Sequence, residues 1–173
     1  LDYARPDHVS LQALPLAALA QAAAQPFASR EDMQVQIDVP PELRVMGDEV
    51  ELSRVLANLL ENARRYGKSA DSGIARVRIA ATARDQWVTL RVRAPGVPEE
   101  QLAVLTRPFF RGDTARTEAT GAGLGLSIVA KMVRHMGGEL NLTNSPSGGL
   151  MAVIRLPQAS DRRADHGSLR KRR

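Results

Sequence analysis

A glycine-rich run in the last third of the chain has the composition of an anion-binding loop. Gly121, Gly123 and Gly125 alternate with single residues, and a helix-forming apolar sequence follows from Leu124. Glycine permits close backbone approach, and the free N–H groups at a helix start favour phosphate. The run is neither a Walker loop nor a dinucleotide fingerprint, because no Gly-Lys-Ser/Thr follows and a polar segment precedes it. Taken alone, it is equally compatible with a loop selected for tight packing.

A second candidate lies on the strongest helix that the sequence predicts, Asp48–Tyr66. Asn58 and Asn62 are four residues apart and share one face of this helix. Buried amides need partners, so Asn62, supported by Asn58, could offer an amide oxygen to a Mg²⁺ ion that carries phosphates. Arg65 would then meet phosphate charge. The alternative is that Asn58 caps a neighbouring loop and Arg65 is solvated.

A polar segment, Arg107–Asp113, separates these two candidates. It contains Phe109 and Phe110, two of the three phenylalanines in the chain. The two rings could anchor a segment that folds over a ligand and brings Arg111 to a phosphate. A surface loop pinned to the core by two aromatic rings explains the same residues equally well.

Strands and helices must position these candidates, and the sequence predicts both. Apolar residues alternate in the segments expected to be strands and recur at helical spacing in the expected helices. The predicted strands cover residues 33–39, 43–46, 75–81, 87–92, 139–143 and 149–156, and the predicted helices 15–25, 48–66, 98–105 and 124–136. Regular βαβ alternation is missing, which favours an α+β sandwich with one mixed sheet and the helices on one face.

Two of the predicted helices carry more detailed expectations. Asp48 and Glu51 have the spacing of a capping box at the start of the first. In the second, Ile128, Val129 and Met132 are expected on the inner face. The apolar stripe of the first helix is expected to consist of Leu52, Val55, Leu56, Leu59 and Ala63.

Composition narrows the class of protein. The 173 residues are 43% hydrophobic but only 3% aromatic, so aliphatic side chains must form the core. No cysteine is present, which excludes disulfides and thiolate metal sites. Of the net charge of +5, +4 lies in Asp161–Arg173, so the rest of the chain is close to neutral. This tail is interpreted as solvated and disordered rather than as a nucleic-acid or lipid-binding segment.

Three segments together resemble one family, the sensor histidine kinases. Asn58–Gly67 resembles their asparagine box, Arg107–Arg111 their phenylalanine box, and Gly121–Val129 their second glycine box. The boxes occur in the family's order and spacing, and the resemblance covers Val35–Leu156. It is closest to the osmosensor-like kinases of Gram-negative bacteria. The same superfamily includes DNA gyrase, heat-shock chaperones and MutL-type repair proteins.

The resemblance implies a Bergerat-type two-layer α/β sandwich that binds Mg-ATP under a lid. It implies that Asn62 holds the metal and that Arg65 and Arg111 contact phosphates, with Tyr66 near the nucleoside. The glycines of the second box would line the phosphates with their backbone. The implied cofactor site comprises Asn58, Asn62, Arg65, Tyr66, Gly96, Arg111, Gly121, Gly123, Leu124, Gly125 and Leu126.

The family's phosphoacceptor histidine has no counterpart here, because His8, His135 and His166 lie in other contexts. The expected organisation is the end of a dimerisation and phosphoacceptor hairpin in residues 1–6, a catalytic ATP-binding domain in 7–158 and a basic disordered tail in 159–173. The implied partners are that hairpin and a response regulator, with no nucleic acid. The parent would be a homodimeric bacterial inner-membrane protein with this domain in the cytoplasm.

The first glycine box departs from the family pattern Asp-x-Gly-x-Gly. Gly96 matches its last glycine, which places Val92 on the aspartate and Ala94 on the first glycine. In the family, the aspartate accepts a hydrogen bond from the adenine amino group, and valine has no acceptor. Losing such a bond would cost about 1.5–3 kcal/mol of binding free energy. Ala94 would add strain if its position required positive φ.

Three hypotheses follow from this pattern. The first is an ATP-binding kinase domain, not expected to autophosphorylate alone and impaired by its altered first glycine box. The second is a docking module that keeps the fold without the nucleotide, and the missing aspartate favours it. The third is a chaperone or repair ATPase of the same superfamily, which acts without a histidine hairpin.

Overall fold

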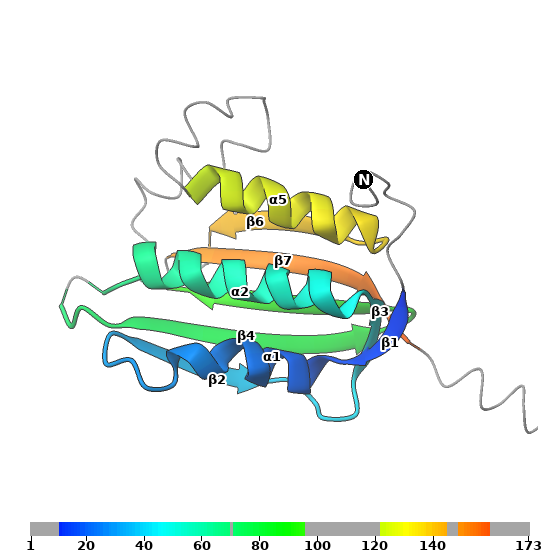
Figure 1. Ribbon diagram of the computed structural model, residues 1–173, viewed down its shortest axis with the longest axis horizontal. Helices are drawn as coiled ribbons and strands as arrows, with labels where there is room; N and C mark the ends of the chain where they lie inside the picture. Colours follow the sequence, from blue (N-terminus) through cyan, green and yellow to red (C-terminus); the bar gives the residue numbers. More distant parts are fainter. Residues whose placement is uncertain (1–10, 70, 96–121, 145–148, 160–173) are drawn as a thin grey trace, which may run out of the picture.

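The computed structural model describes residues 11–69, 71–95, 122–144 and 149–159. Within these ranges the chain forms two sheets and a layer of helices (Figure 1). The expected helix at 98–105 and the polar segment at 107–113 lie outside them. So do both chain ends, including residues 1–6 and the basic tail from residue 160 onward.

The main sheet has five strands in the order β2-β4-β5-β7-β6. β2 pairs with β4 in parallel, and the remaining neighbours are antiparallel. A smaller antiparallel sheet joins β1 to β3. The strands are β1 Gln12–Pro15, β2 Met33–Asp38, β3 Arg44–Gly47, β4 Ala75–Arg84, β5 Trp87–Ala94, β6 Glu139–Asn144 and β7 Leu150–Pro157.

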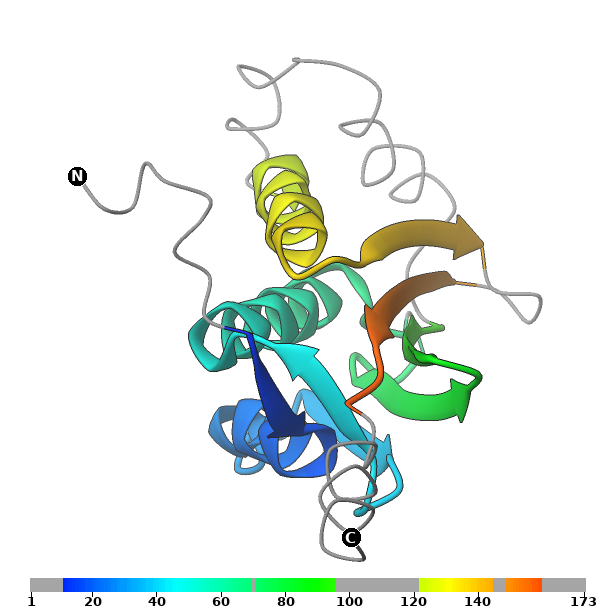
Figure 2. The same ribbon diagram turned by 90° about the vertical axis from the view of Figure 1, so that its right-hand side faces the viewer.

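The helices are α1 Leu16–Ala24, α2 Glu49–Tyr66 and α5 Ala122–His135, with a short 3-10 turn, η3, at Gln25–Phe27. All three α-helices lie on one side of the five-stranded sheet (Figure 2). The predicted α+β sandwich with a mixed sheet and one helical layer is therefore confirmed. No helix in the described ranges has the length and apolarity that a membrane crossing requires.

α2 begins as the sequence predicts, because the Asp48 side chain accepts a hydrogen bond from the Glu51 N–H at 2.9 Å. The Asp48 N–H itself donates to the Met136 sulfur at 3.4 Å, which ties the start of α2 to the end of α5. The Asp48 side-chain cap stabilises the helix by about 1 kcal/mol. The whole predicted stripe is buried: Leu52, Val55, Leu56, Leu59 and Ala63.

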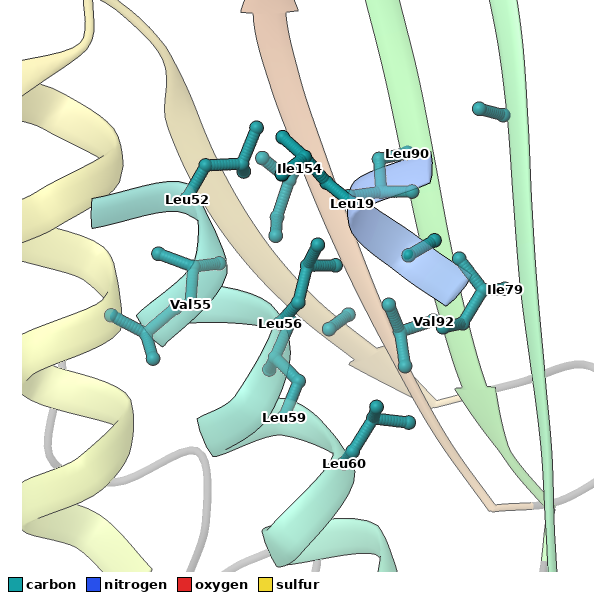
Figure 3. Packing of buried hydrophobic residues seen from close by; sticks show 14 of the residues in the cluster. Leu19, Leu52, Val55, Leu56, Leu59, Leu60, Ile79, Leu90, Val92 and Ile154 are labelled. Atoms are coloured by element: carbon teal, nitrogen blue, oxygen red, sulfur yellow. The ribbon is translucent and has the colours of Figure 1, made fainter. Parts of the chain in front are cut away.

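The core lies between α2 and the sheet. Figure 3 shows leucines of α2 facing Ile79, Leu90 and Val92 on β4 and β5, which alternate with outward-facing residues along their strands. Aliphatic side chains from the three helices and the main sheet fill this layer. Burial of this apolar surface supplies most of the driving force for folding.

The buried face of α5 differs from the predicted one. Val129 is fully buried, but Ile128 is 40% exposed, so the expectation for Ile128 was wrong. The buried face is Leu126, Val129, Ala130, Val133 and Met136. These residues follow the period of 3.6, and Ile128, two positions after Leu126, falls on the opposite side.

Glycines end α5 by the mechanism that the sequence suggests. The Gly138 N–H donates to the Val133 carbonyl and the Gly137 N–H to the Arg134 carbonyl, each at 3.0 Å. Gly137 has φ of +82°, the left-handed conformation that glycine adopts without penalty. A Cβ on Gly138 would lie 2.0 Å from the Arg155 carbonyl oxygen, so β7 packs directly on this turn.

Candidate functional site

A small cavity lies where α2, α5, β5 and β7 meet. Its volume is about 20 Å³, which is room for about one water molecule. The cavity is lined by Leu59, Asn62, Ala63, Val92, Ala94, Leu126, Leu150 and Ala152. The structure therefore brings together Asn62, Leu126 and the position aligned with the family's aspartate. Asn58, one turn earlier on α2, is half-buried and does not line the cavity.

Asn62 is the only polar side chain among the residues that line this cavity. Its Nδ2 atom is buried and has no hydrogen-bond partner among the described residues. Leaving such a donor unpaired costs about 1–3 kcal/mol. An unpaired donor in an otherwise apolar cavity is a common feature of sites that accept a ligand or an ordered water.

Val92 forms the wall of the cavity on the sheet side. It is 4% exposed and pairs with Ile79 on β4 and Ala152 on β7. Its side chain lies on the helix-facing side of the sheet, across from Leu59 of α2 (Figure 3). A carboxylate at this position would face the same cavity as Asn62, but valine leaves that cavity without an acceptor.

Ala94 is not strained. Among the described residues other than glycine, only Asp85 has positive φ, so the conformational penalty considered for Ala94 is absent. Ala94 is buried and lies beside Gly67, the residue that ends α2. A Cβ on Gly67 would lie 2.6 Å from the Ala63 carbonyl oxygen. Glycine at position 67 thus lets the chain stay close to the last turn of α2, with Ala94 of β5 in ordinary contact beside it.

α5 begins at Ala122, two residues earlier than predicted. Gly123 and Gly125 therefore lie in the first helical turn, together with Leu124, and not in a loop before it. The N–H groups of a first turn have no intrahelical partner, so the glycine run supplies free donors from within the helix. Leu126, the next residue, is fully buried in the wall of the cavity. The start of α5 is thereby fixed next to Asn62.

Arg65 and Arg64 share one carboxylate, that of Glu61. The Arg64 guanidinium makes a bidentate pair with Glu61, and Arg65 Nε lies 3.3 Å from its Oε1. These hydrogen bonds, the Arg64 pair first, lower the pKa of Glu61. Arg65 is half exposed and loosely held, so it is free to reach another anion. The i, i+3 and i, i+4 spacing was the signal for this cluster.

Asp32 anchors the C-terminal end of α2 from outside the helix. It accepts hydrogen bonds from Arg30 at 2.9 and 3.2 Å and lies 3.1 Å from Lys68 Nζ. Hydrogen bonds from Arg30 and then Lys68 hold the pKa of Asp32 below its usual range. Lys68 follows directly on Gly67, so this ion pair fixes the segment that leaves α2. Sequence spacing alone gave no sign of it.

Of the remaining expected site residues, Tyr66 lies within the described ranges and the others lie outside them. Tyr66 is half-buried and packs against the core at the end of α2. Gly96, Arg111 and Gly121 lie outside the described residues. The structure thus describes the base of the expected site, on α2, β5 and the start of α5.

A metal ion at Asn62 would depend on ligands from outside this base. The described residues contain no group of three or more His, Cys, Asp or Glu side chains arranged to hold a metal. Mg²⁺ commonly keeps several waters and is held by one or two protein groups plus substrate phosphates. A single amide on α2 fits that mode of binding and does not fit a structural metal site.

Comparison with known proteins connects this geometry to a family. The sequence profile described as "Histidine kinase-, DNA gyrase B-, and HSP90-like ATPase" matches residues 47–160. Signal transduction histidine-protein kinase BaeS of Escherichia coli (strain K12) is 37% identical over 138 residues, which is 78% of this chain. That alignment covers 28% of the E. coli protein, so this chain spans a little over a quarter of that relative's length.

Two solved structures share the fold. The ATP binding domain of PrrB from Mycobacterium tuberculosis is 27% identical with a TM-score of 0.64, covering 87% of this chain and 98% of that one. Full-length ShkA in complex with AMPPNP is 25% identical with a TM-score of 0.67, covering 91% of this chain and 34% of that one. Both similarities extend over nearly the whole of the chain.

Proposed function

We propose an activity from the premise that this chain belongs to the histidine kinase-, DNA gyrase B- and HSP90-like ATPase family, as an ATP-binding catalytic domain of the sensor-histidine-kinase type. The proposal is that the chain binds Mg-ATP beside Asn62. In its parent protein it would position the γ-phosphate for transfer to a histidine on a helical hairpin. Catalysis of this kind consists mostly of positioning and electrostatic stabilisation.

The observation that carries the proposal is the unpaired Asn62 amide next to the first turn of α5. The Nδ2 atom of Asn62 is buried in an apolar cavity and has no hydrogen-bond partner among the described residues. The N–H of Gly123 is among the donors without an intrahelical partner at the start of the helix whose Leu126 forms part of the cavity wall. Helix N-termini favour phosphate, and a polar group beside an apolar cavity suits a nucleoside. The structure of full-length ShkA, which shares this fold, is a complex with AMPPNP, and this supports nucleotide binding as the function.

The roles of the other residues follow from their places. Asn62, with Asn58 one turn away, would hold the metal, and bound Mg²⁺ would neutralise phosphate charge. Arg65 would exchange its exposed contact with Glu61 for a phosphate oxygen. Tyr66 would pack near the nucleoside. We assign Gly96, Arg111 and Gly121 to the same site on the family resemblance alone.

The parent protein would be a homodimeric bacterial sensor of the inner membrane. This domain would lie in the cytoplasm and act on its own dimerisation and phosphoacceptor hairpin, from which a response regulator would receive the phosphoryl group. In a protein of this kind, residues 1–6 would be the end of the hairpin, residues 7–158 the catalytic domain and residues 159–173 a tail. An upstream phosphoacceptor segment in the parent gene would separate this proposal from a chaperone or repair ATPase.

A specific observation favours a second function, that of a nucleotide-free docking module. Val92 offers no acceptor to an adenine amino group, and the cavity of about 20 Å³ is far too small for a nucleobase without movement of its walls. The two functions differ in whether any nucleotide binds. Calorimetric titration of the full chain with AMPPNP and Mg²⁺ tests this directly.

The expected result is saturable binding that is lost in Asn62→Ala and weakened less in Asn58→Ala. We expect affinities for ATP and inosine triphosphate to be nearly equal, because Val92 cannot read the amino group. Absence of binding at millimolar nucleotide would support the docking module. Restored binding in Val92→Asp would then show that the pocket is otherwise intact.

A further inference from the structure

The face of the main sheet opposite the helices is strongly basic. No described element covers it (Figure 2). By strand alternation and register, six arginines project from this face: Arg76, Arg78, Arg84, Arg91, Arg93 and Arg155. Only Asp38 and Glu139 provide negative charge on the same strands and face. The face therefore carries excess positive charge that the fold itself does not require.

The six arginines are not equivalent. Arg155 lies 3.7 Å from Glu139 and over the Trp87 ring, 4.6 Å from its centroid. Arg91 is 3.4 Å from the Thr82 hydroxyl. These two arginines, toward the β6 side and the middle of the sheet, are held by contacts within the face.

Arg93 has no such contact within the described ranges. Its Nε is buried and has no hydrogen-bond partner among the described residues. It lies directly opposite Arg78 on the neighbouring strand, and like charges in that position repel each other. A buried guanidinium N–H without an acceptor is a costly arrangement. An anion seated here would remove both penalties.

The surface around Arg93 is hollowed. The hollow has a volume of about 450 Å³. Its lining includes the side chains of Gln34, Gln36, Arg76, Arg78 and Arg93, with Pro95 at one end. Arg93 and Val92 are consecutive on β5, so this hollow and the Asn62 cavity lie on opposite faces of the sheet.

A carboxylate of the chain itself, that of Asp38, already binds to donors on this face. Asp38 accepts from Arg78 Nε at 2.6 Å and from Gln36 Nε2 at 3.1 Å. The next positions, around Arg93 and Arg76, repeat the same donor types, with Gln34 beside Arg76 in the register. Among the residues that the structure describes, the one hydrogen-bond contact of the Arg76 side chain is with the Ser72 hydroxyl at 3.4 Å.

We propose that this hollow is a docking site for an acidic, extended segment of a partner protein, whose carboxylates bind Arg93 and Arg76. Alternate residues of an extended chain recur at roughly 6.6–6.8 Å, close to the roughly 7–8 Å between diagonal neighbours on adjacent strands such as Arg76 and Arg93. The glutamines supply neutral donors and acceptors for peptide groups. The lining has no exposed aromatic side chain for base stacking and no large apolar side chain for insertion into lipid.

The test is a fluorescence-polarisation titration of the full chain with a labelled peptide in which Glu alternates with Ser. A peptide with Gln for every Glu is the charge control. We expect saturable binding of the acidic peptide, weakened about tenfold by Arg93→Gln and about two- to fivefold by Arg76→Gln. Arg84→Gln removes the same charge from the far end of β4 and is expected to leave the affinity unchanged.

Circular dichroism and unfolding temperature would show that each variant is folded. The proposal would be overturned by the absence of saturable binding, or by equal weakening in Arg84→Gln and Arg93→Gln, which would indicate diffuse charge attraction. Inorganic phosphate and vesicles with anionic lipid serve as parallel probes. Binding of either probe with the same variant pattern, in place of the peptide, would also contradict a protein segment as the ligand.

Discussion

Replacing Val92 with aspartate would place a carboxylate in the cavity that Asn62 lines. Because the position is only 4% exposed, the carboxylate would be largely removed from water. In the nucleotide-free chain, the neighbouring donor without a partner among the described residues is Asn62 Nδ2. We expect Val92→Asp to lower the free energy of unfolding by about 1–3 kcal/mol, since one amide compensates a buried charge incompletely.

The same substitution is expected to strengthen ATP binding. A charge-assisted hydrogen bond to the adenine amino group is worth about 1.5–3 kcal/mol, or roughly a ten- to hundredfold gain in affinity. Val92→Asn is the matched comparison, because it offers a neutral acceptor of similar size. Its gain should be smaller, at about 0.5–1.5 kcal/mol. Ala94 can be left unchanged, because its backbone is unstrained.

The assay is calorimetric titration of each variant with ATP and with inosine triphosphate, which carries an oxygen in place of the amino group. Only ATP should gain affinity in Val92→Asp, whereas the original chain should bind both nucleotides nearly equally. Chemical denaturation measures the stability cost independently. An equal gain for both nucleotides, or no gain in a variant that remains folded, would refute the assignment of Val92 to the base-recognising position.

Other substitutions test the fold and its charges. Leu56→Ala removes a fully buried side chain from α2 and should lower the free energy of unfolding by about 2–5 kcal/mol in chemical denaturation. Gly138→Ala should cost about 1–3 kcal/mol by the same measurement, because the new Cβ would lie 2.0 Å from the Arg155 carbonyl oxygen. Asp32→Asn should lower the unfolding temperature at neutral pH. The pKa of Asp32 is depressed in the folded chain, so its contribution is complete above its unfolded pKa of about 4 and disappears as the pH falls through the folded value. The difference between the two proteins should therefore shrink below about pH 4, and a constant difference would contradict the ion pair as its cause.

The sequence predicted the elements of this fold better than their arrangement. The alternation in β4 and β5 and the stripe of α2 are local patterns, and both were confirmed because burial on one face imposes them. The strand order, in which β7 separates β5 from β6, depends on pairings between distant segments. Ile128 was misplaced because several apolar residues compete for one helix face, and only the packing of α5 decides among them.

The site shows the same division. Asn62 and the glycines at the start of α5 were identifiable because residue types and spacing carry their chemistry. Leu150 and Ala152, which complete the cavity, could not be identified, since they reach it only through the pairing of β7 with β5. Arg93 also gave no local signal. Its position opposite Arg78 comes from the strand register, and its Nε has no hydrogen-bond partner among the described residues.

Side-chain amide NMR can detect directly whether a nucleoside triphosphate binds beside Asn62. The chain would be labelled with ¹⁵N and titrated with AMPPNP and Mg²⁺, with Asn62→Ala used to assign the resonance. We expect a saturable shift of the Asn62 side-chain N–H signals, together with shifts of the Gly123 and Gly125 backbone signals. An Asn62 signal that stays unchanged at millimolar nucleotide would contradict binding beside Asn62.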